Sequence, residues 1–448
     1  MIDWLIVGGG VQGTTLGVWL RKVGGVPSSS LRIIDPEAEL LGRWGEMTQN
    51  VGMEFLRSPV VHHLDVQSHA LESWMKGQLG EWAEGAFTAP YHRPSYEWFQ
   101  RFHRTVIEET ELSTSHTRGW VTGLEQLGRE GWRVRWTETT SSASGRGSSN
   151  DSSESVEAGT SERTVECEAR HVVLAIGVTD RPAWPDWANR LRDTDDRGRI
   201  LEHLFSRGFS PETWGLAAGA RVAVVGGGIS AAQVALKLAK FGAESILIRR
   251  HPIREADFDS DPGWLGPRRM NGFSKVRCYR RRRAEIQRAR NRGSLPREVA
   301  SDLKRAVRHG RIQELEGVVT EAVAANSGVR LQVSAAGRTR RLAVDRVLLA
   351  TGFEGRRPGG AWLDETIAAC DLPVAPCGFP IVDASLRWDA PAEGSKATSG
   401  LYVAGGLAEL ELGPTARNIA GARESARRLT EAARWCSTEP CLVAAVNS

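Results

Sequence analysis

The sequence predicts an α/β protein made of two three-layer units, with the second unit inserted into the first. Two glycine-rich turns predict the units, because each follows a short apolar strand and precedes a helix. Matched apolar strands at 171–177 and 346–353 predict the insertion, because they bracket the segment that carries the second turn.

The first unit begins with a strand, a turn and a helix. Residues 4–7 are apolar and predict a strand, 8–13 form the turn, and 14–23 predict a helix. A second apolar strand then ends at Asp35. This order is the β-α-β arrangement of a Rossmann-like domain.

The middle of the chain repeats that order. An apolar strand at 221–225 leads into the glycines of 226–228, and a helix follows over about 230–240. The next strand, 245–248, is followed by Arg249 and Arg250. The sequence therefore predicts two Rossmann-like domains: 1–205 and 346–448 form the two parts of the first, and 206–345 is the inserted second.

A serine-rich tract at 139–164 interrupts the first unit without ending it. It has almost no apolar residues and predicts an extended surface loop. The flanking segments 132–136 and 164–167 look like the two strands of a hairpin.

Composition narrows the class of protein. The chain has 448 residues, 41% hydrophobic and 25% charged, with a net charge of +4, so no polyanionic partner is expected. It has no run of about 18 apolar residues and no signal peptide pattern, so we expect a cytoplasmic protein without membrane or nucleic-acid partners. Homo-oligomerisation is left open.

The first turn fits G-x-G-x-x-G with Gly8, Gly10 and Gly13. The first glycine permits the turn, the second lets backbone N–H groups approach a pyrophosphate, and the third lets helix and strand pack closely. Asp35 is placed to accept hydrogen bonds from ribose hydroxyls. This combination predicts a dinucleotide site.

The second turn reads Gly226-x-Gly228-x-x-Ala231, and its second strand ends in arginines instead of an acid. An acid would repel a 2′-phosphate, whereas a guanidinium binds it, so Arg249 and Arg250 favour NADPH over NADH. We expect NADPH to contact residues of this unit: Gly226, Gly228, Ile229, Ser230, Ala231, Arg249, Arg250 and Gly352.

Two dinucleotides of different kinds indicate hydride transfer from nicotinamide to flavin, so the first site is assigned to FAD. Near the C-terminus, a strand at 401–406 precedes a helix that begins near Asn418, and the positive end of that helix could face the flavin. We expect FAD to contact the following residues: Gly8, Gly10, Val11, Gln12, Gly13, Asp35, Pro36, Gly177, Gly405, Asn418 and Ile419.

Six cysteines are scattered without a C-x-x-C pair or zinc-ligand spacing, so no metal site is expected. No cysteine precedes Cys167, which excludes the reductases that keep a cysteine pair beside the flavin. Electrons must leave the flavin by another route.

The order GxGxxG, LAIG, GGGISAA, LLATGF resembles the flavin-dependent class B monooxygenases, in particular the branch that hydroxylates lysine or ornithine at nitrogen. The resemblance implies FAD, NADPH, molecular oxygen and a small-molecule substrate. It also implies a flavin C4a-hydroperoxide that transfers oxygen to a nucleophile such as an amine nitrogen.

Local matches place further residues. Arg43 with Trp44 resembles the aromatic segment after the second strand of that family, and Met53 begins a stretch similar to its flavin-side segment. Both segments are therefore added to the FAD site. Glu54 stands where the family carries glutamine, and Arg57 is the nearby cation instead of a lysine, which moves the expected substrate away from ornithine and lysine.

The candidate catalytic residues are Met53, Glu54, Arg57, His63 and Asn271. The adjacent His62 and His63 could line a cleft, although packing is the commoner role for such a pair.

The arginines of the run Arg277–Arg292 are expected to form either a solvated helix face or a positively charged rim that attracts NADPH. A nucleic-acid-binding patch is the alternative interpretation.

Three functions remain open on sequence alone. The first is an NADPH-dependent, FAD-containing monooxygenase that oxygenates an amine nitrogen. The second is a two-dinucleotide flavoprotein reductase or dehydrogenase without oxygen insertion. The third is a catalytically silent nucleotide-binding sensor, against which both intact glycine turns argue.

Overall fold

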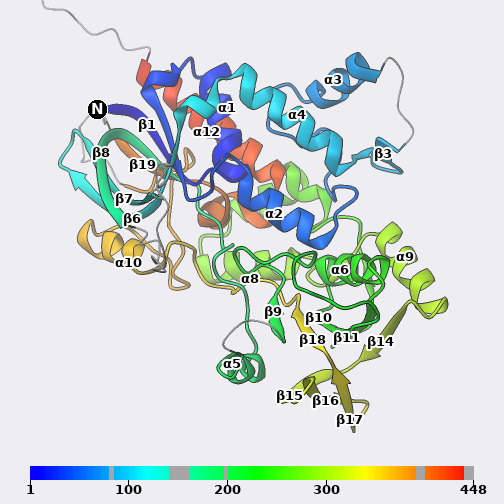
Figure 1. Cartoon of the computed structure of the whole chain (residues 1–448). Coiled ribbons are helices and arrows are strands. Elements are labelled where there is room, and N and C mark those ends of the chain that lie inside the picture. Colours follow the sequence, from blue (N-terminus) through cyan, green and yellow to red (C-terminus); the bar gives the residue numbers. More distant parts are fainter. Residues whose placement is uncertain (80–84, 141–160, 196–199, 390–398, 438–448) are drawn as a thin grey trace, which may run out of the picture.

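The computed structural model describes residues 1–79, 85–140, 161–195, 200–389 and 399–437. Figure 1 shows two α/β units, one above the other. The first sheet and its helices lie in the upper part of the view, and the second sheet and its helices lie in the lower part. The two glycine turns belong to different sheets. The predicted fold class, two Rossmann-like domains, is confirmed.

The first sheet has the strand order β5-β2-β1-β8-β7-β6, with β19 paired to β8. Its strands are β1 (Ile2–Val7), β2 (Leu31–Asp35), β5 (His116–Arg118), β6 (Trp120–Leu127), β7 (Gly131–Thr140), β8 (Ser161–Leu174) and β19 (Gly400–Val403). Strands β5, β2, β1, β8 and β19 pair in parallel, which is the core of a doubly wound sheet.

Strand β8 serves two parts of this sheet. Its first half pairs antiparallel with β7, with Val134 opposite Cys167, so the predicted hairpin is confirmed. Its second half pairs in parallel with β1 and β19. Most of the serine-rich tract, residues 141–160, lies outside the described residues.

The second sheet is entirely parallel, in the order β14-β11-β10-β18-β9. Its strands are β9 (Leu201–His203), β10 (Arg221–Val225), β11 (Glu244–Arg249), β14 (Ile312–Glu316) and β18 (Arg346–Leu349). Between β14 and β18 the chain forms an antiparallel sheet of β15 (Val318–Ala325), β16 (Gly328–Ala335) and β17 (Arg338–Val344). Two-residue strands complete the set: β3 (Phe87–Thr88), β4 (Arg93–Pro94), β12 (Arg254–Glu255) and β13 (Ser294–Leu295).

The strand pairing moves both expected domain boundaries. Strand β9 lies before the boundary expected at 205 and β18 lies after the one expected at 345, yet both belong to the second sheet. Leu201 is opposite Val347, and β18 pairs with β10. The inserted unit therefore begins by β9 and extends through β18, because parallel pairing joins strands that are distant in sequence.

Helices cover both sheets. Helix α1 (Val11–Lys22) packs against α12 (Ile419–Ser437) beside the first sheet, and α6 (Ile229–Lys240) packs against α9 (Arg297–Arg308) beside the second (Figure 1). The other helices are α2 (Gly42–Val51), α3 (Ala70–Leu79), α4 (Tyr96–Glu109), α5 (Asp186–Arg192), α7 (Pro267–Ser274), α8 (Tyr279–Ala289), α10 (Gly360–Ala369) and α11 (Glu409–Leu412). Among the described residues, no helix is long and apolar enough to cross a membrane.

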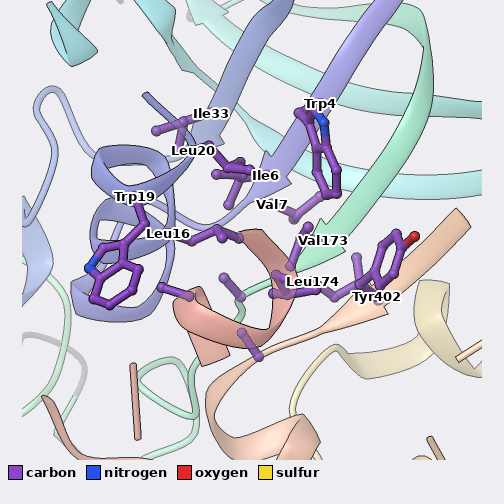
Figure 2. Packing of buried hydrophobic residues seen from close by; sticks show 14 of the residues in the cluster. Trp4, Ile6, Val7, Leu16, Trp19, Leu20, Ile33, Val173, Leu174 and Tyr402 are labelled. Atoms are coloured by element: carbon purple, nitrogen blue, oxygen red, sulfur yellow. The ribbon is translucent and has the colours of Figure 1, made fainter. Parts of the chain in front are cut away.

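The first core joins the two ends of the chain. Figure 2 shows Leu16 and Leu20 of α1 beside Ile6 of β1, and all three side chains are fully buried. Trp4 stacks on His171 with ring centroids 4.5 Å apart and lies 5.7 Å from Tyr402 of β19. Each large apolar side chain buried in this way contributes roughly 1.5–3 kcal/mol, so this core holds the first turn and the C-terminal segment together.

The first turn depends on two close approaches. Gly8 has φ +107, a conformation that favours glycine, and a Cβ added there would lie 2.8 Å from Ala175 O. A Cβ added at Gly13 would lie 1.8 Å from Gly8 O, so α1 could not keep its place on β1. By contrast, a Cβ at Gly10 would have no neighbour within 4 Å.

These contacts predict different outcomes for two alanine substitutions. Gly13→Ala should lower the free energy of unfolding by about 3 kcal/mol, because helix and strand are forced apart. Gly10→Ala should change it by less than about 1 kcal/mol. Urea unfolding followed by tryptophan fluorescence measures both, and equal losses in the two variants would contradict the proposed packing role of Gly13.

Candidate functional site

The first glycine turn leaves the start of α1 open. Gly10 precedes the helix, and no side chain caps it. The first backbone N–H groups of a helix lack partners within the helix and form a favourable site for an anion. The space beside Gly10 is therefore suited to a pyrophosphate.

Asp35 closes the other side of this turn. Its Oδ2 accepts a hydrogen bond of 2.6 Å from Gly9 N, and its Oδ1 accepts one of 2.9 Å from Glu37 N. Burial raises the pKa of Asp35, while these two backbone donors oppose the shift. Its neighbour Pro36 uses its carbonyl to accept from Arg118 Nε at 3.2 Å.

Residues from opposite ends of the chain meet at this turn. Gln12 Nε2 donates to Ala416 O at 3.1 Å and to Asn418 O at 3.2 Å, just before α12 begins at Ile419. A Cβ added at Gly405 would lie 2.8 Å from Gln12 Cγ. The structure thus brings together Gln12, Gly405, Asn418 and Ile419, which the sequence placed in one site.

The helix α2 supplies Arg43 and Trp44, but their side chains have structural partners. The buried Arg43 guanidinium pairs with Glu46 and donates to Phe205 O in the segment that enters the second unit. Trp44 packs on Phe99, with ring centroids 5.5 Å apart. Both side chains therefore pack within the protein, although Arg43 Nε is buried without a hydrogen-bond partner among the described residues.

The second turn repeats the first at the start of α6. A Cβ at Gly226 would lie 2.4 Å from Ala350 O and 3.0 Å from the methyl group of Ala231, so strand and helix are close here too. Gly228 precedes the helix without a side-chain cap. A Cβ at Gly228 would lie 3.6 Å from Gly293 Cα, so the loop around Gly293 covers this turn.

The residues expected beside each turn lie as follows. Ile229 and Ser230 occupy the first positions of α6. Gly352, with φ +80, follows β18, and its carbonyl accepts a hydrogen bond of 2.8 Å from Ala183 N. Gly177 follows β8 in the first unit, and Val11 opens α1.

The two arginines after β11 differ in their surroundings. Arg249 donates from Nε to Glu314 and from Nη1 to Glu316, at 2.5 and 2.8 Å, and its side chain is largely buried. Arg250 is exposed, and no partner is observed for it among the described residues. Arg250 is therefore the cation that remains available for a phosphate.

A cavity of about 230 Å³ lies between the two units. One side comes from the first unit and the other from the segment after β12. Its lining residues are Arg57, Ser58, Pro59, Val61, His62, Phe258, Asp259, Ser260, Asp261, Pro262, Leu265, Thr415, Asn418 and Ala420. Because Asn418 also accepts from Gln12, the cavity lies next to the first glycine turn.

His62, and not the candidate His63, lines this cavity. Burial, followed by the charge of Arg423, lowers the pKa of each histidine to about 4, so both are neutral at pH 7. The His63 ring is fully buried, with Nε2 3.1 Å from Ser68 O and the ring edge-on to Phe102. The structure places His63 in the core and keeps it from a substrate in this cavity.

Arg57 joins the two units. Its Nη1 donates to Asp259 Oδ1 at 2.7 Å, and its Nη2 donates to Ala256 O at 2.6 Å and Ser294 Oγ at 2.8 Å. Nε donates to Asp257 O at 3.2 Å. Burial lowers the pKa of this arginine, and the charge of Asp259 opposes the shift. The guanidinium is committed to the insertion and is not a free cation for a substrate carboxylate.

The other catalytic candidates lie apart from the cavity lining. Met53 packs against the cores of both units. Glu54 is exposed and pairs with Lys240 of α6. Asn271 is exposed on α7. None of these three lines the cavity.

Sequence reasoning missed the acidic side of the cavity. Asp259 and Asp261 lie there, on either side of Ser260. The run Asp257-Phe258-Asp259-Ser260-Asp261-Pro262 was the available signal, because alternating aspartates before a proline are typical of a turn that exposes carboxylates. Without the fold, nothing placed that run beside residues 57–62.

Four cysteines are free thiols, and none of these four lines the cavity; they are Cys167, Cys278, Cys370 and Cys377. Cys441 lies outside the described residues. Within the described part of the chain, no group of three or more His, Cys, Asp or Glu residues could hold a metal ion.

Comparisons with known proteins agree with this architecture. The sequence model of the pyridine nucleotide-disulphide oxidoreductase family matches residues 105–262, which include the second glycine turn. A search of curated proteins gives no match.

Several solved structures share the fold over nearly the whole chain. An ornithine hydroxylase from Pseudomonas aeruginosa (PvdA) has 17% identity and a TM-score of 0.70, covering 97% of this chain and 99% of that one. An ornithine N-hydroxylase from Kutzneria sp. 744, solved with reduced FAD, NADP+ and L-ornithine, has 18% identity and a TM-score of 0.68, covering 98% and 100%.

A bacillithiol disulfide reductase from Bacillus cereus has 15% identity and a TM-score of 0.55, covering 98% of this chain and 99% of that one. At such identities the likeness establishes the fold. The resemblance to the N-hydroxylating monooxygenases is confirmed at that level.

The Arg57 contacts lead to a prediction about stability. Arg57→Met should lower the free energy of unfolding by about 3 kcal/mol, because it leaves Asp259 and several carbonyl groups of the insertion without their donor. Lys240→Met is the matched control, since it removes an exposed ion pair between the same units and should cost less than about 1 kcal/mol. Thermal and urea unfolding of the two variants measure the difference, and a loss as small for Arg57→Met as for the control would show that Arg57 does not hold the two units together.

Proposed function

We propose that the protein is an FAD-containing, NADPH-dependent monooxygenase that oxygenates a small nucleophilic substrate at an amine nitrogen. The observation that carries this proposal is the cavity between the two units. It adjoins the first glycine turn through Asn418, and one of its walls comes from the insertion that carries the second glycine turn. Such a cavity is where a substrate could meet a flavin.

The residues of the first turn fit FAD. The start of α1 is uncapped and open beside Gly10. Gln12 Oε1 is buried without a hydrogen-bond partner in the described structure, so a donor on a bound group would complete it. We propose that the turn of residues 8–13 holds the pyrophosphate, with Asp35 at the ribose and the start of α12 toward the flavin ring.

When both cofactors are bound, NADPH supplies hydride and the reduced flavin supplies the means to activate oxygen. The chain supplies the surroundings. Arg57 and the segment it holds form one wall of the cavity, and that wall limits the access of water to a reactive oxygen species. Asp261, the lining carboxylate that Arg57 does not bind, attracts an amine in its cationic form, and His62, neutral at pH 7, adds no repelling charge.

Similar solved structures support this reading, since several are ornithine or lysine hydroxylating enzymes. The bacillithiol disulfide reductase and the family match favour a second candidate, a flavoprotein reductase without oxygen insertion. The cavity lining has no cysteine, so such a reductase would need an acceptor other than a thiol pair beside the flavin.

Rapid mixing with oxygen tests these functions. The purified protein is reduced with NADPH without oxygen, mixed with oxygenated buffer, and followed by flavin absorbance. A monooxygenase should show a C4a-hydroperoxide band that persists until an amine is added, because a site that limits the access of water slows the collapse of the peroxide. Direct reoxidation without that band would favour the reductase, and protein without flavin would leave only a nucleotide sensor.

Coenzyme preference tests the role of Arg250. Arg250→Gln should raise the KM for NADPH about ten-fold and leave the KM for NADH unchanged, because one charge-assisted contact to the 2′-phosphate is lost. Arg254→Gln is the matched control, since Arg254 is also exposed and lies just beyond β11. Equal KM values for NADPH in the wild type and Arg250→Gln would refute this assignment.

A further inference from the structure

A cluster of arginines surrounds one buried carboxylate where the insertion meets the C-terminal segment. Glu409 of α11 is 1% exposed. It pairs with Arg283 of α8, and Arg417 Nε lies 2.8 Å from its Oε2. Arg290 and Arg292, which follow α8, complete the cluster, because their charges act on Arg283 or on each other.

The positive charge of this cluster exceeds what its acids neutralise. Arg283 and Arg417 share the one buried carboxylate, no acidic partner is observed for Arg290 or Arg292 among the described residues, and the nearby Asp259 is bound to Arg57. The half-buried guanidinium of Arg290 has no hydrogen-bond partner among the described residues. Burial, followed by the charge of Arg417, lowers the pKa of both Arg283 and Arg290 to about 10. Like charges at this depth are unfavourable unless an anion joins them.

The cluster adjoins the cavity between the two units. Arg290 forms an antiparallel backbone bridge with Ser260, which lines the cavity. Arg417 precedes Asn418, another lining residue. A molecule in the cavity could therefore extend one end toward the arginines while its other end stays beside the first glycine turn.

We propose that Arg283, Arg290, Arg292 and Arg417 bind a doubly charged oxyanion group of the substrate, whose amine lies in the adjoining cavity. This assignment rests on the proposed monooxygenase function. A guanidinium binds phosphoryl and carboxylate oxygens with paired hydrogen bonds, so either a phosphoryl group or two carboxylates would fit. A doubly charged group matches the charge better than a single carboxylate, because Glu409 offsets only one of the four positive charges and pairs with Arg283 and Arg417 alone.

The phosphates of NADPH are the rival occupant. Gly293, next to Arg292, covers the second glycine turn, so a nucleotide there would lie near the cluster. The position of Arg417 and Glu409 favours the substrate instead, because both belong to the C-terminal segment that adjoins α12 and the first turn.

Binding of inorganic phosphate to the full-length, FAD-loaded protein tests the site. Equilibrium dialysis with labelled phosphate should show affinity at least ten-fold weaker for Arg290→Gln than for wild type. Arg288→Gln, which removes an exposed arginine near the end of α8, two residues before Arg290, should bind phosphate as wild type does. The Tm of Arg290→Gln should not fall, because the substitution removes an unpaired charge from a cationic cluster. Equal affinity in wild type and Arg290→Gln would overturn the proposal.

Saturating NADP+ separates the two occupants. Phosphate binding should be unchanged by NADP+ if the cluster serves the substrate, and displacement of phosphate by NADP+ would overturn the proposal in favour of the nucleotide.

An amine screen separates this proposal from the proposed function. Aminoalkyl phosphates and amino dicarboxylates are compared with amines that lack an anionic group, by NADPH oxidation and by mass detection of an added oxygen. We expect one of the two anionic classes to be preferred at least ten-fold by wild type, and the preference to be lost in Arg290→Gln. If amines with and without an anionic group are oxygenated equally well, the proposed anion site is overturned and the proposed monooxygenase function stands. Arg290-dependent phosphate binding without oxygenation of any amine would instead overturn the function.

Discussion

A largely buried guanidinium holds the insertion against the first unit. Arg57 donates to Asp259, to carbonyl groups of the segment after β12 and to Ser294 Oγ, so one side chain joins several points of the second unit. Arg93 acts in the same way nearby, with Nη1 2.6 Å and Nη2 2.8 Å from the two carboxylate oxygens of Glu298. The cavity exists because these contacts keep its two walls together.

Arginine is suited to this role because its planar, permanently charged group satisfies several acceptors at once. The net charge of +4 does not reveal how unevenly the arginines are distributed. The basic run at 277–292 divides in the fold: Arg280 and Arg281 are exposed, as expected of a solvated helix face, whereas Arg283 is buried against Glu409. The arginines of one continuous run in the sequence therefore lie in two different environments, one exposed to solvent and one buried.

Much of the fold followed from local patterns. The two turns, their flanking strands and helices, and the hairpin of β7 and β8 were predicted, because each depends on residues close together in the chain. The boundaries of the insertion were not predicted. Strand β18 belongs to the second sheet because it pairs with β10, and β9 belongs to it because it pairs with β18. Likewise, the sequence alone indicates that Arg249 is an unpaired cation. In the structure, β14 places Glu314 and Glu316 beside it, and both pair with it.

The sequence by itself determined where the glycines stand and why no other residue suits them, since the contact of Gly13 with Gly8 arises within one β-α unit. Only the tertiary structure decided which side chains face the cavity. His62 lines it while its neighbour His63 is buried in the core, and Asp259 reaches it from the other unit. The physical reason is that a cavity wall is made by packing between distant segments, and local periodicity carries no information about that packing.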